Sequence, residues 1–514
     1  MTTASTCEKT GKKKIDLYGR LGGKSQWKAR DVEAARKHFA EIAPDDIPEL
    51  VAVHKAWMAM LVECGVVERE RGRRILEVLA GVDDAAIDEM VADFDPDTPK
   101  PVYQLERYLT NKVGDSGSDV NIGRTIPPPF YRLAVRKAML VLLPAISDLQ
   151  EVAIDKAAEH VDTVMPGYTH GQHAQPTTLG HYLMSFNDAL ERAYVQAEAA
   201  YANVNLCDLG CGALAGTSFD VDRQSPARWL GFDGVLENAN DCVASTDQAV
   251  DVVCALTNIA IPLGRVANEM YTWSSFEYNM VEIADELSAP SSMMPQKKNP
   301  AMLEYMRMKL GEVAACYADI VTRAHGIPYG DVCDIKEISM RVCGTTRGVA
   351  GALKSFGRFL DTVIVKKKIM RERAAAGFST ASELAAVLYR EANIPLRLAH
   401  GVVAAVVRRV WSDGGLATEI TSDIVDEAAL EVVGRRANLS PEALHRGLDP
   451  AEFVKVHTCQ GGVAPVEVRR MIADRREKLA AGRERQRARL AQNENAAAEL
   501  DAVVSEIVGG KQSA

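Results

Sequence analysis

The sequence predicts an all-α protein built from three mainly helical domains, and two observations support this fold class. Long stretches in the middle of the chain repeat apolar residues in alternating steps of four and three, the pattern of helices in a left-handed bundle. No stretch of note shows the apolar–polar alternation of a half-buried strand. The chain of 514 residues, 47% of them hydrophobic, is also too long for one ordinary core.

Four segments carry the four-three repeat, so four long helices are expected to bury one seam each. Alanine and methionine on their other faces favour burial on several sides, which suggests self-association. The seam positions are Leu142, Ile146, Leu149 and Ala153; Leu179, Leu183, Phe186, Leu190, Ala193, Ala197, Ala200 and Val204; Val252, Leu256, Ile259, Leu263, Val266 and Met270; and Leu303, Met306, Leu310, Val313, Tyr317 and Ile320.

Breaks rich in proline and glycine divide the chain into three expected domains. Residues 1–125 form an N-terminal helical domain, in which the pattern breaks near Pro44. Residues 126–365 form the long-helix domain. Residues 366–514 form a smaller helical domain, and its Arg/Glu-rich tail is expected to be a solvated helix.

Composition argues against several classes of function. A net charge of −10 disfavours broad nucleic-acid binding, which needs a basic surface. We expect no membrane partner, because no apolar run looks long enough to span a bilayer and the first residues lack a secretory pattern. The ten cysteines are scattered without zinc spacing, as expected for reduced thiols in a cytoplasmic protein.

The most informative stretch is residues 289–300, where two hydroxyls, two ammonium groups and an amide precede a long helical pattern. Asn299 suits the N-cap and Pro300 the first helical position. Free N–H groups and the positive end of the helix dipole suit an anion there. The stretch therefore predicts a loop that holds an anionic ligand, although a plain capped loop would explain the Asn-Pro pair equally well.

A second candidate is the segment 166–176, which joins two helical patterns. It contains Thr169 and His170 beside a glycine, followed by Gln175. Histidine exchanges protons near neutral pH, but a loop histidine satisfied by the backbone is the alternative. His173 follows three residues later without a carboxylate or third ligand nearby, so we expect no metal.

These stretches resemble the fumarase/aspartase superfamily in its argininosuccinate lyase branch. Ser-Ser-Met-Met-Pro-Gln-Lys-Lys-Asn-Pro at residues 291–300 resembles the signature loop, and Tyr-Thr-His-x-Gln-x-Ala-Gln-Pro at 168–176 resembles the second signature. Gly-Ala-Leu-Ala-Gly-Thr-Ser-Phe at 212–219 and Gly-Gly-Val-Ala-Pro at 461–465 are also similar to argininosuccinate lyase. The resemblance is good over residues 166–312, thinner but continuous to about residue 473, and weak before Gly123.

The resemblance implies a carbon–nitrogen lyase without cofactor or metal. It implies that Ser291 is the general base, stabilised as an alkoxide by Lys297, and that His170, backed by Glu304, assists proton transfer. It further implies a homotetramer whose central bundles share one core, with each active site built from loops of three chains. The implied substrate contacts are Thr169, Gln175, Ser292, Asn299, Arg124, Thr125 and Tyr329.

Residues that would set specificity depart from the family pattern. The family's Gly-Arg-Ser-Arg-Asn-Asp run is Gly-Arg-Thr-Ile-Pro-Pro here, so Ile126 and Pro127 replace an Arg and an Asn that grip the succinyl carboxylates. The Gln and Lys that recognise the arginine part become Asp334 and Glu337. These losses argue against argininosuccinate itself.

We therefore predict a small anionic, amino-acid-derived substrate: an N-substituted aspartate cleaved to an amine and fumarate or a related unsaturated acid. Asp331 and Asp334 favour a cationic amine. Two alternatives stay open from the sequence. One is a non-catalytic relative with the same fold, and the other is an elimination or cyclisation enzyme whose substrate has one carboxylate.

Overall fold

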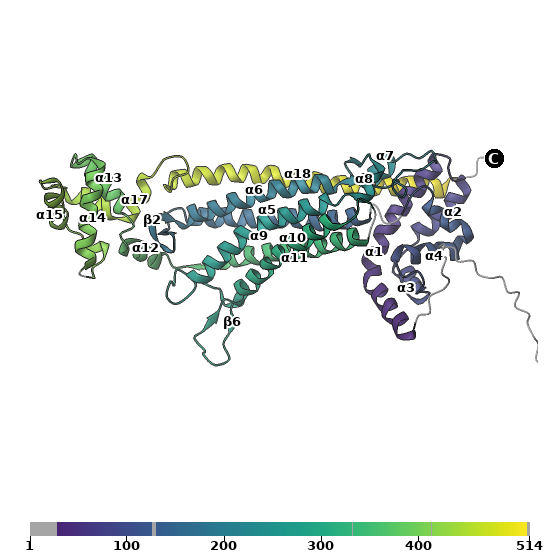
Figure 1. The fold of residues 1–514 in the computed structure, drawn as a ribbon, viewed down its shortest axis with the longest axis horizontal. Helices are drawn as coiled ribbons and strands as arrows, with labels where there is room; N and C mark the ends of the chain where they lie inside the picture. The colour runs from purple at the N-terminus through teal and green to yellow at the C-terminus, as the bar shows by residue number, and fades with distance from the viewer. Residues whose placement is uncertain (1–27, 126–129, 331–332, 413, 511–514) are drawn as a thin grey trace, which may run out of the picture. The chain divides into compact units, whose positions relative to one another are not determined.

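The computed structural model describes residues 28–125, 130–330, 333–412 and 414–510, and it confirms the all-α class. Those residues form 18 α-helices, and every sheet among them has only two strands. The chain divides into two compact units (Figure 1). The first comprises the described residues of Met1–Phe130, Leu209–Leu230 and Ala496–Ala514, and the second comprises those of Tyr131–Asp208 and Gly231–Asn495.

The first unit is built around one long helix. This helix, α1 (Ala29–Glu63), continues through Pro44 and Pro48, so the expected break near Pro44 is wrong. Ala43 and Ile47 are fully buried on either side of Pro44, and this packing outweighs the local helix-breaking tendency. The other elements of the unit are α2 (Arg69–Ala80), α3 (Asp84–Ala92), α4 (Pro101–Val113), the 3₁₀ helix η1 (Gly114–Asn121) and α7 (Gln224–Trp229).

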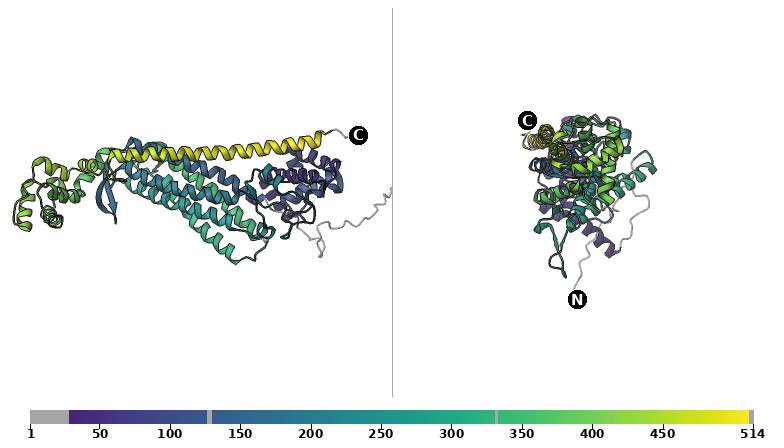
Figure 2. Two further views of the ribbon diagram at one scale, coloured as in Figure 1. Left: turned by 90° about the horizontal axis from the view of Figure 1, so that it is seen from above. Right: turned by 90° about the vertical axis from the view of Figure 1, so that its left-hand side faces the viewer.

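The second unit contains the predicted bundle (Figures 1 and 2). Its helices are α5 (Phe130–Glu159, all but its first residue), α6 (Leu179–Val204), α9 (Asp247–Trp273), α10 (Ala301–Gly326) and α11 (Cys333–Thr362). Every seam position predicted on these helices is buried except Tyr317, which is 40% exposed. Cys316, the preceding residue, is fully buried and continues the seam between Val313 and Ile320 in its place.

Helix α9 passes a simple test for a membrane span by its length and apolar composition, which the sequence expectation had overlooked. Half of the tested window is buried inside the protein. The helix packs against α6, α10 and α11, and its buried apolar residues belong to the bundle core. A core helix of this kind passes the same test without any membrane.

Short strands mark the ends of the bundle. Strands β1 (Val164–Thr169) and β2 (Gln172–Thr178) form a hairpin between α5 and α6. Two more pairs lie between α9 and α12: β5 (Val281–Glu282) with β8 (Ile364–Val365), and β6 (Ala289–Pro290) with β7 (Lys298–Asn299). Because successive helices of the bundle run in opposite directions, these two pairs and the β1–β2 hairpin lie at the same end of the bundle. The pair β3 (Leu206–Cys207) and β4 (Gly234–Val235), helix α8 (Ala239–Ala244) and residues 327–330 lie at the other end.

The helices after the bundle have their own core, formed mainly by α13, α14, α15 and α16. Their bounds are α12 (Lys367–Ala376), α13 (Ala381–Glu391), α14 (Leu396–Ser412), η3 (Ala417–Glu419), α15 (Ser422–Val433), α16 (Pro441–Leu448) and α17 (Pro450–Val456).

The tail forms a single helix, α18 (Pro465–Gly509), and the expectation of a solvated helix is wrong for the face that meets the bundle. Val468 and Met471 are buried in the bundle core. Its arginines meet acidic residues of α5 and α6: Arg475 binds Asp188 at 2.8 Å, and Arg485 binds Glu198. The charge that suggested solvation is therefore used in ion pairs along the bundle.

Candidate active site

The predicted histidine lies at the tip of a β-hairpin. His170 and Gly171 form the two-residue turn between β1 and β2, and both have positive φ, 55° and 71°. Two successive positive φ values are typical of a type I′ hairpin turn. The turn exposes Thr169 and His170 to solvent at one end of the bundle. The sequence expectation of a plain interhelical loop missed this hairpin, although the His-Gly pair is a suitable turn signal.

Tight packing fixes the hairpin on its inner side. A side chain at Gly167 would place Cβ 2.5 Å from the carbonyl oxygen of Gln175, so the strands approach closely only because this residue is glycine. The Tyr168 ring packs edge-on against His173 at 5.2 Å and lies 6.1 Å from Tyr278. Tyr278 follows α9, so this contact joins the hairpin to the segment that leads to Ser291.

Two of the hairpin's polar side chains face the C-terminal helices. Gln175 donates from Nε2 to the Ser382 hydroxyl at 3.3 Å. Desolvation, and then the charge of Arg373, lower the pKa of His173. In the described parts of the chain, no three or more His, Cys, Asp or Glu side chains are placed to hold a metal ion.

The second candidate stretch forms a loop held at its base by β6 and β7. We refer to residues 291–297 as the serine loop. It projects from the bundle beside the label β6 in Figure 1. The Ser291 side chain is half-buried, and its hydroxyl accepts the backbone N–H of Met294 at 3.0 Å and of Met293 at 3.4 Å. Residues 292–298 are exposed.

Asn299 does not cap α10, so that prediction is wrong by one position. Asn299 pairs with Ala289 in the β6–β7 ladder, and the helix begins at Ala301 after Pro300. No side chain caps this helix end, because the ladder holds Asn299 in an extended conformation. Glu304 lies exposed in the first turn of α10.

The two adjacent lysines have different surroundings. Lys298 binds Glu282 at 2.7 Å and Asp285 at 2.5 Å, and these carboxylates raise its pKa. Lys297 is exposed, and no ion pair to it occurs among the described residues. Lys297 is therefore the ammonium group available to a ligand, a distinction that the sequence does not make.

Among the described residues, no polar contact brings the predicted catalytic side chains together. Across the described ranges, no hydrogen bond or ion pair joins His170 to Ser291 or Glu304. Tyr329 lies still further away, beyond the far end of α10. That helix has 26 residues and spans about 39 Å. The Tyr329 hydroxyl donates to Asp241 at 3.1 Å there.

The remaining predicted residues belong to the first unit. Arg124 donates from Nε to the carbonyl of Val120 at 2.7 Å, and its Nη2 lies 3.3 Å from both ring nitrogens of His54. Burial lowers the pKa of Arg124 to about 10, while Glu106 acts in the opposite direction. The guanidinium therefore packs against interior residues of its own unit.

Residues 123–125 lie beside the loop 212–217, which the sequence had also singled out. A Cβ at Gly123 would lie 3.0 Å from the Thr217 hydroxyl, so the two segments touch. Thr125 closes the described part of this segment. Ile126, Pro127 and Asp331 lie outside the described residues.

Comparison with known proteins gives the family of this chain. Residues 31–315 match the family described as lyase, and residues 378–455 match the argininosuccinate lyase C-terminal family. Argininosuccinate lyase of Methanothermobacter thermautotrophicus is 33% identical over 422 residues, which cover 82% of this chain and 90% of that protein. That of Methanococcus maripaludis is 32% identical and covers 91% and 95%.

The fold is shared with EDDS lyase. The crystal structure of EDDS lyase in complex with formate superposes with a TM-score of 0.82 at 30% identity, covering 94% of this chain and 97% of that one. A variant of EDDS lyase with bound fumarate gives a TM-score of 0.81 at the same identity. The chain therefore belongs to the argininosuccinate lyase-like branch of the fumarase/aspartase superfamily and is a carbon–nitrogen lyase.

Proposed function

We propose that the enzyme eliminates an amine from an N-substituted aspartate, giving fumarate or a related unsaturated acid. The observation that carries this proposal is the serine loop shortly before the uncapped start of α10. It combines a half-buried Ser291 hydroxyl with an exposed Lys297 that has no ion pair among the described residues. Fumarate bound to an EDDS lyase variant of similar fold supports a dicarboxylate product.

In the proposed reaction, Ser291 removes a proton from the β-carbon of the aspartate part, which carries a carboxylate but no nitrogen. The electron pair moves onto that carboxylate, which becomes doubly charged. Its collapse forms the carbon–carbon double bond and breaks the carbon–nitrogen bond, and the amine leaves with a proton. Lys297 and the N–H groups at the start of α10 would stabilise the extra charge. His170, backed by Glu304, would supply the leaving proton or orient a water.

The proposed substrate is not argininosuccinate. The Arg and Asn that would grip a second carboxylate are replaced by Ile126 and Pro127, and an alkyl side chain cannot replace a guanidinium fork. Arg124, the remaining arginine of that run, is engaged with Val120 and His54. Asp334, in the first turn of α11, favours a cationic amine as the leaving group.

The test is to incubate the enzyme with fumarate and a panel of mono- and diamines, and separately with argininosuccinate. We expect addition of a cationic amine to fumarate and slow or no cleavage of argininosuccinate. Mass spectrometry of the products measures both reactions. Fast turnover of argininosuccinate would refute the specificity claim. Conversion of a substrate with one carboxylate to a single product of unchanged mass would instead favour the cyclisation alternative, which the loss of the Arg-Asn pair supports.

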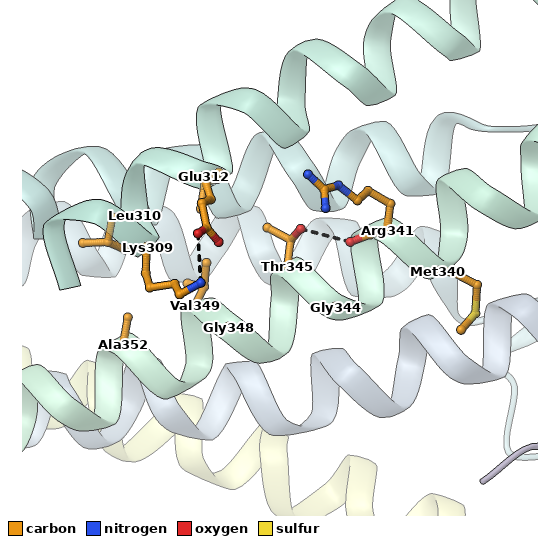
Figure 3. Close-up of a pocket in the computed structure, with 11 residues that line it drawn as sticks. Lys309, Leu310, Glu312, Met340, Arg341, Gly344, Thr345, Gly348, Val349 and Ala352 are labelled. Carbon is orange, nitrogen blue, oxygen red and sulfur yellow. Dashed lines mark hydrogen bonds and ion pairs between the residues drawn. The ribbon is translucent and has the colours of Figure 1, made fainter. Parts of the chain in front are cut away.

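We further propose a homotetramer with sites shared between chains. The separation of Ser291 and Tyr329 by the length of α10 supports this, since only another copy could bring both to one substrate. A groove between α10 and α11 offers a surface for that copy (Figure 3). Gly344 and Gly348 leave open space along it, and Tyr305 and Met308 of α10 are exposed nearby in sequence. Light scattering should give four times the 55.9 kDa chain mass; an active monomer would contradict the proposal.

A further inference from the structure

The base of the serine loop is tied to the bundle by one carboxylate that no sequence motif marks. Glu282 places Oε1 2.7 Å from the ammonium group of Lys298 and Oε2 3.1 Å from that of Lys366. Each oxygen thus serves a different lysine. Lys298 directly follows the serine loop and begins β7, whereas Lys366 follows β8, more than sixty residues later in the chain.

The backbone around Glu282 is held at the end of the bundle. Glu282 belongs to β5, which pairs with β8, and its neighbours Val281 and Ile283 are buried. Lys366 is held by two further contacts: its backbone N–H donates to the carbonyl of Met280 at 3.0 Å, and its Nζ donates to Asn279 at 2.5 Å. Movement of this anchor would therefore require movement of the bundle end itself.

Asp285 also binds Lys298, but it cannot replace Glu282 as an anchor. The Asp285 side chain is 85% exposed, whereas that of Glu282 is 34% exposed. Exposed ion pairs contribute little because water competes and the side chains lose entropy. Asp285 also reaches only one lysine, so it does not connect the loop to β8.

We propose that Glu282 is a positioning residue that fixes the C-terminal arm of the serine loop, so that Lys298 anchors the loop while Lys297 faces the substrate. The catalytic part of this inference rests on the proposed function, whereas the anchor itself can be measured without any substrate.

The test compares Glu282→Gln with Glu286→Gln in the full-length protein. Glu286 lies in the same connection, is exposed and forms no ion pair among the described residues. We expect Glu282→Gln to speed amide hydrogen exchange of residues 297–299 at least tenfold and to lower kcat at least tenfold with little change in KM, since small misplacement of reacting groups is costly. Glu286→Gln should match the wild type in both measurements.

A double-mutant cycle separates the anchor from general disruption. Lys298→Met should speed exchange as much as Glu282→Gln, and the double variant should be no worse than either single variant. Lys298→Arg should keep most of the protection because it keeps the charge. Unchanged exchange in Glu282→Gln, or independent effects that multiply in the double variant, would overturn the proposal. If no amine reacts with fumarate, the proposed function fails while these exchange measurements still decide on the anchor.

Discussion

Ser291 is the residue on which the chemistry depends, and its surroundings predict a clean mutational effect. Ser291→Ala should lower kcat by about 10²–10⁴-fold, the usual contribution of a positioned base. Stability should change by at most about 1 kcal/mol, because the hydroxyl bonds only to N–H groups of its own exposed loop. Steady-state kinetics and thermal melting measure both effects.

Ser292→Ala is the matched comparison for that variant. Ser292 is exposed beside Ser291, and its side chain forms no hydrogen bond among the residues that the structure describes. We expect a smaller loss, expressed mainly in KM, because Ser292 is predicted to contact substrate and not to remove the proton. Retention of more than a tenth of the activity in Ser291→Ala would assign the base to another group.

Sequence alone identified the residue types of the candidate site but not their surroundings. It singled out a pair of lysines, yet only the folded chain brings Glu282 to Lys298 and leaves Lys297 without an ion pair in the described part of the chain. Likewise Arg124 was a plausible substrate contact, whereas its packing against His54 joins the segment after η1 to α1, 70 residues earlier in the chain. Such partners are set by tertiary contacts, which a motif in one segment does not encode.

Among the elements, the β1–β2 hairpin depends on one close approach between its strands. Gly167→Ala would force Cβ against the carbonyl of Gln175, at a cost of about 1–3 kcal/mol, and would displace His170. We expect a lower melting temperature and a lower kcat. Gly171→Asn, at the open tip with φ of 71°, should keep stability, since Asn tolerates that conformation. Equal stability of the two variants would argue against the close approach.

His160, in the connection between α5 and the hairpin, is expected to make the stability of the protein depend on pH. Burial, and then Lys367 and Lys156, lower the pKa of His160 to about 4. Between pH 6.5 and 4 the unfolded chain therefore binds the proton more readily than the folded one. Stability from this group is complete above pH 6.5 and is lost as the pH falls toward 4, by at most about 3 kcal/mol.

His160→Gln should remove the part of the pH dependence of stability that comes from this imidazole. Urea unfolding at pH 7.5 and pH 5 measures the change for each protein. His400→Gln, an exposed histidine of α14, is the control and should follow the wild type. If His160→Gln loses as much stability at pH 5 as the wild type, the neutral imidazole is not what stabilises this connection.

The elements themselves were predictable to different degrees for a physical reason. Long bundle helices repeat their apolar seam many times, so α6 and α9 were predicted position by position. The ladder of β6 and β7 has two residues per strand, too few for any alternation to show. The continuity of α1 through Pro44 reflects core packing on both sides of the proline, which local propensity opposes.

At the scale of the whole molecule, the length of the bundle decides how a site can be assembled. His170 and the serine loop share one end of the bundle in a single chain, yet no hydrogen bond or ion pair connects them in the described ranges. We expect each active site to take Ser291 from one chain and His170 from another.

Two inactive variants, Ser291→Ala and His170→Gln, should then restore activity when they are co-expressed. A hybrid site that draws Ser291 from the His170→Gln chain and His170 from the Ser291→Ala chain contains both native residues. Random assembly of four chains should give up to roughly a quarter of wild-type activity. The separately purified variants, mixed without subunit exchange, are the control and should remain inactive. If co-expression restores nothing while the hybrid tetramers form normally by mass, Ser291 and His170 must act within one chain, and the shared-site proposal is wrong.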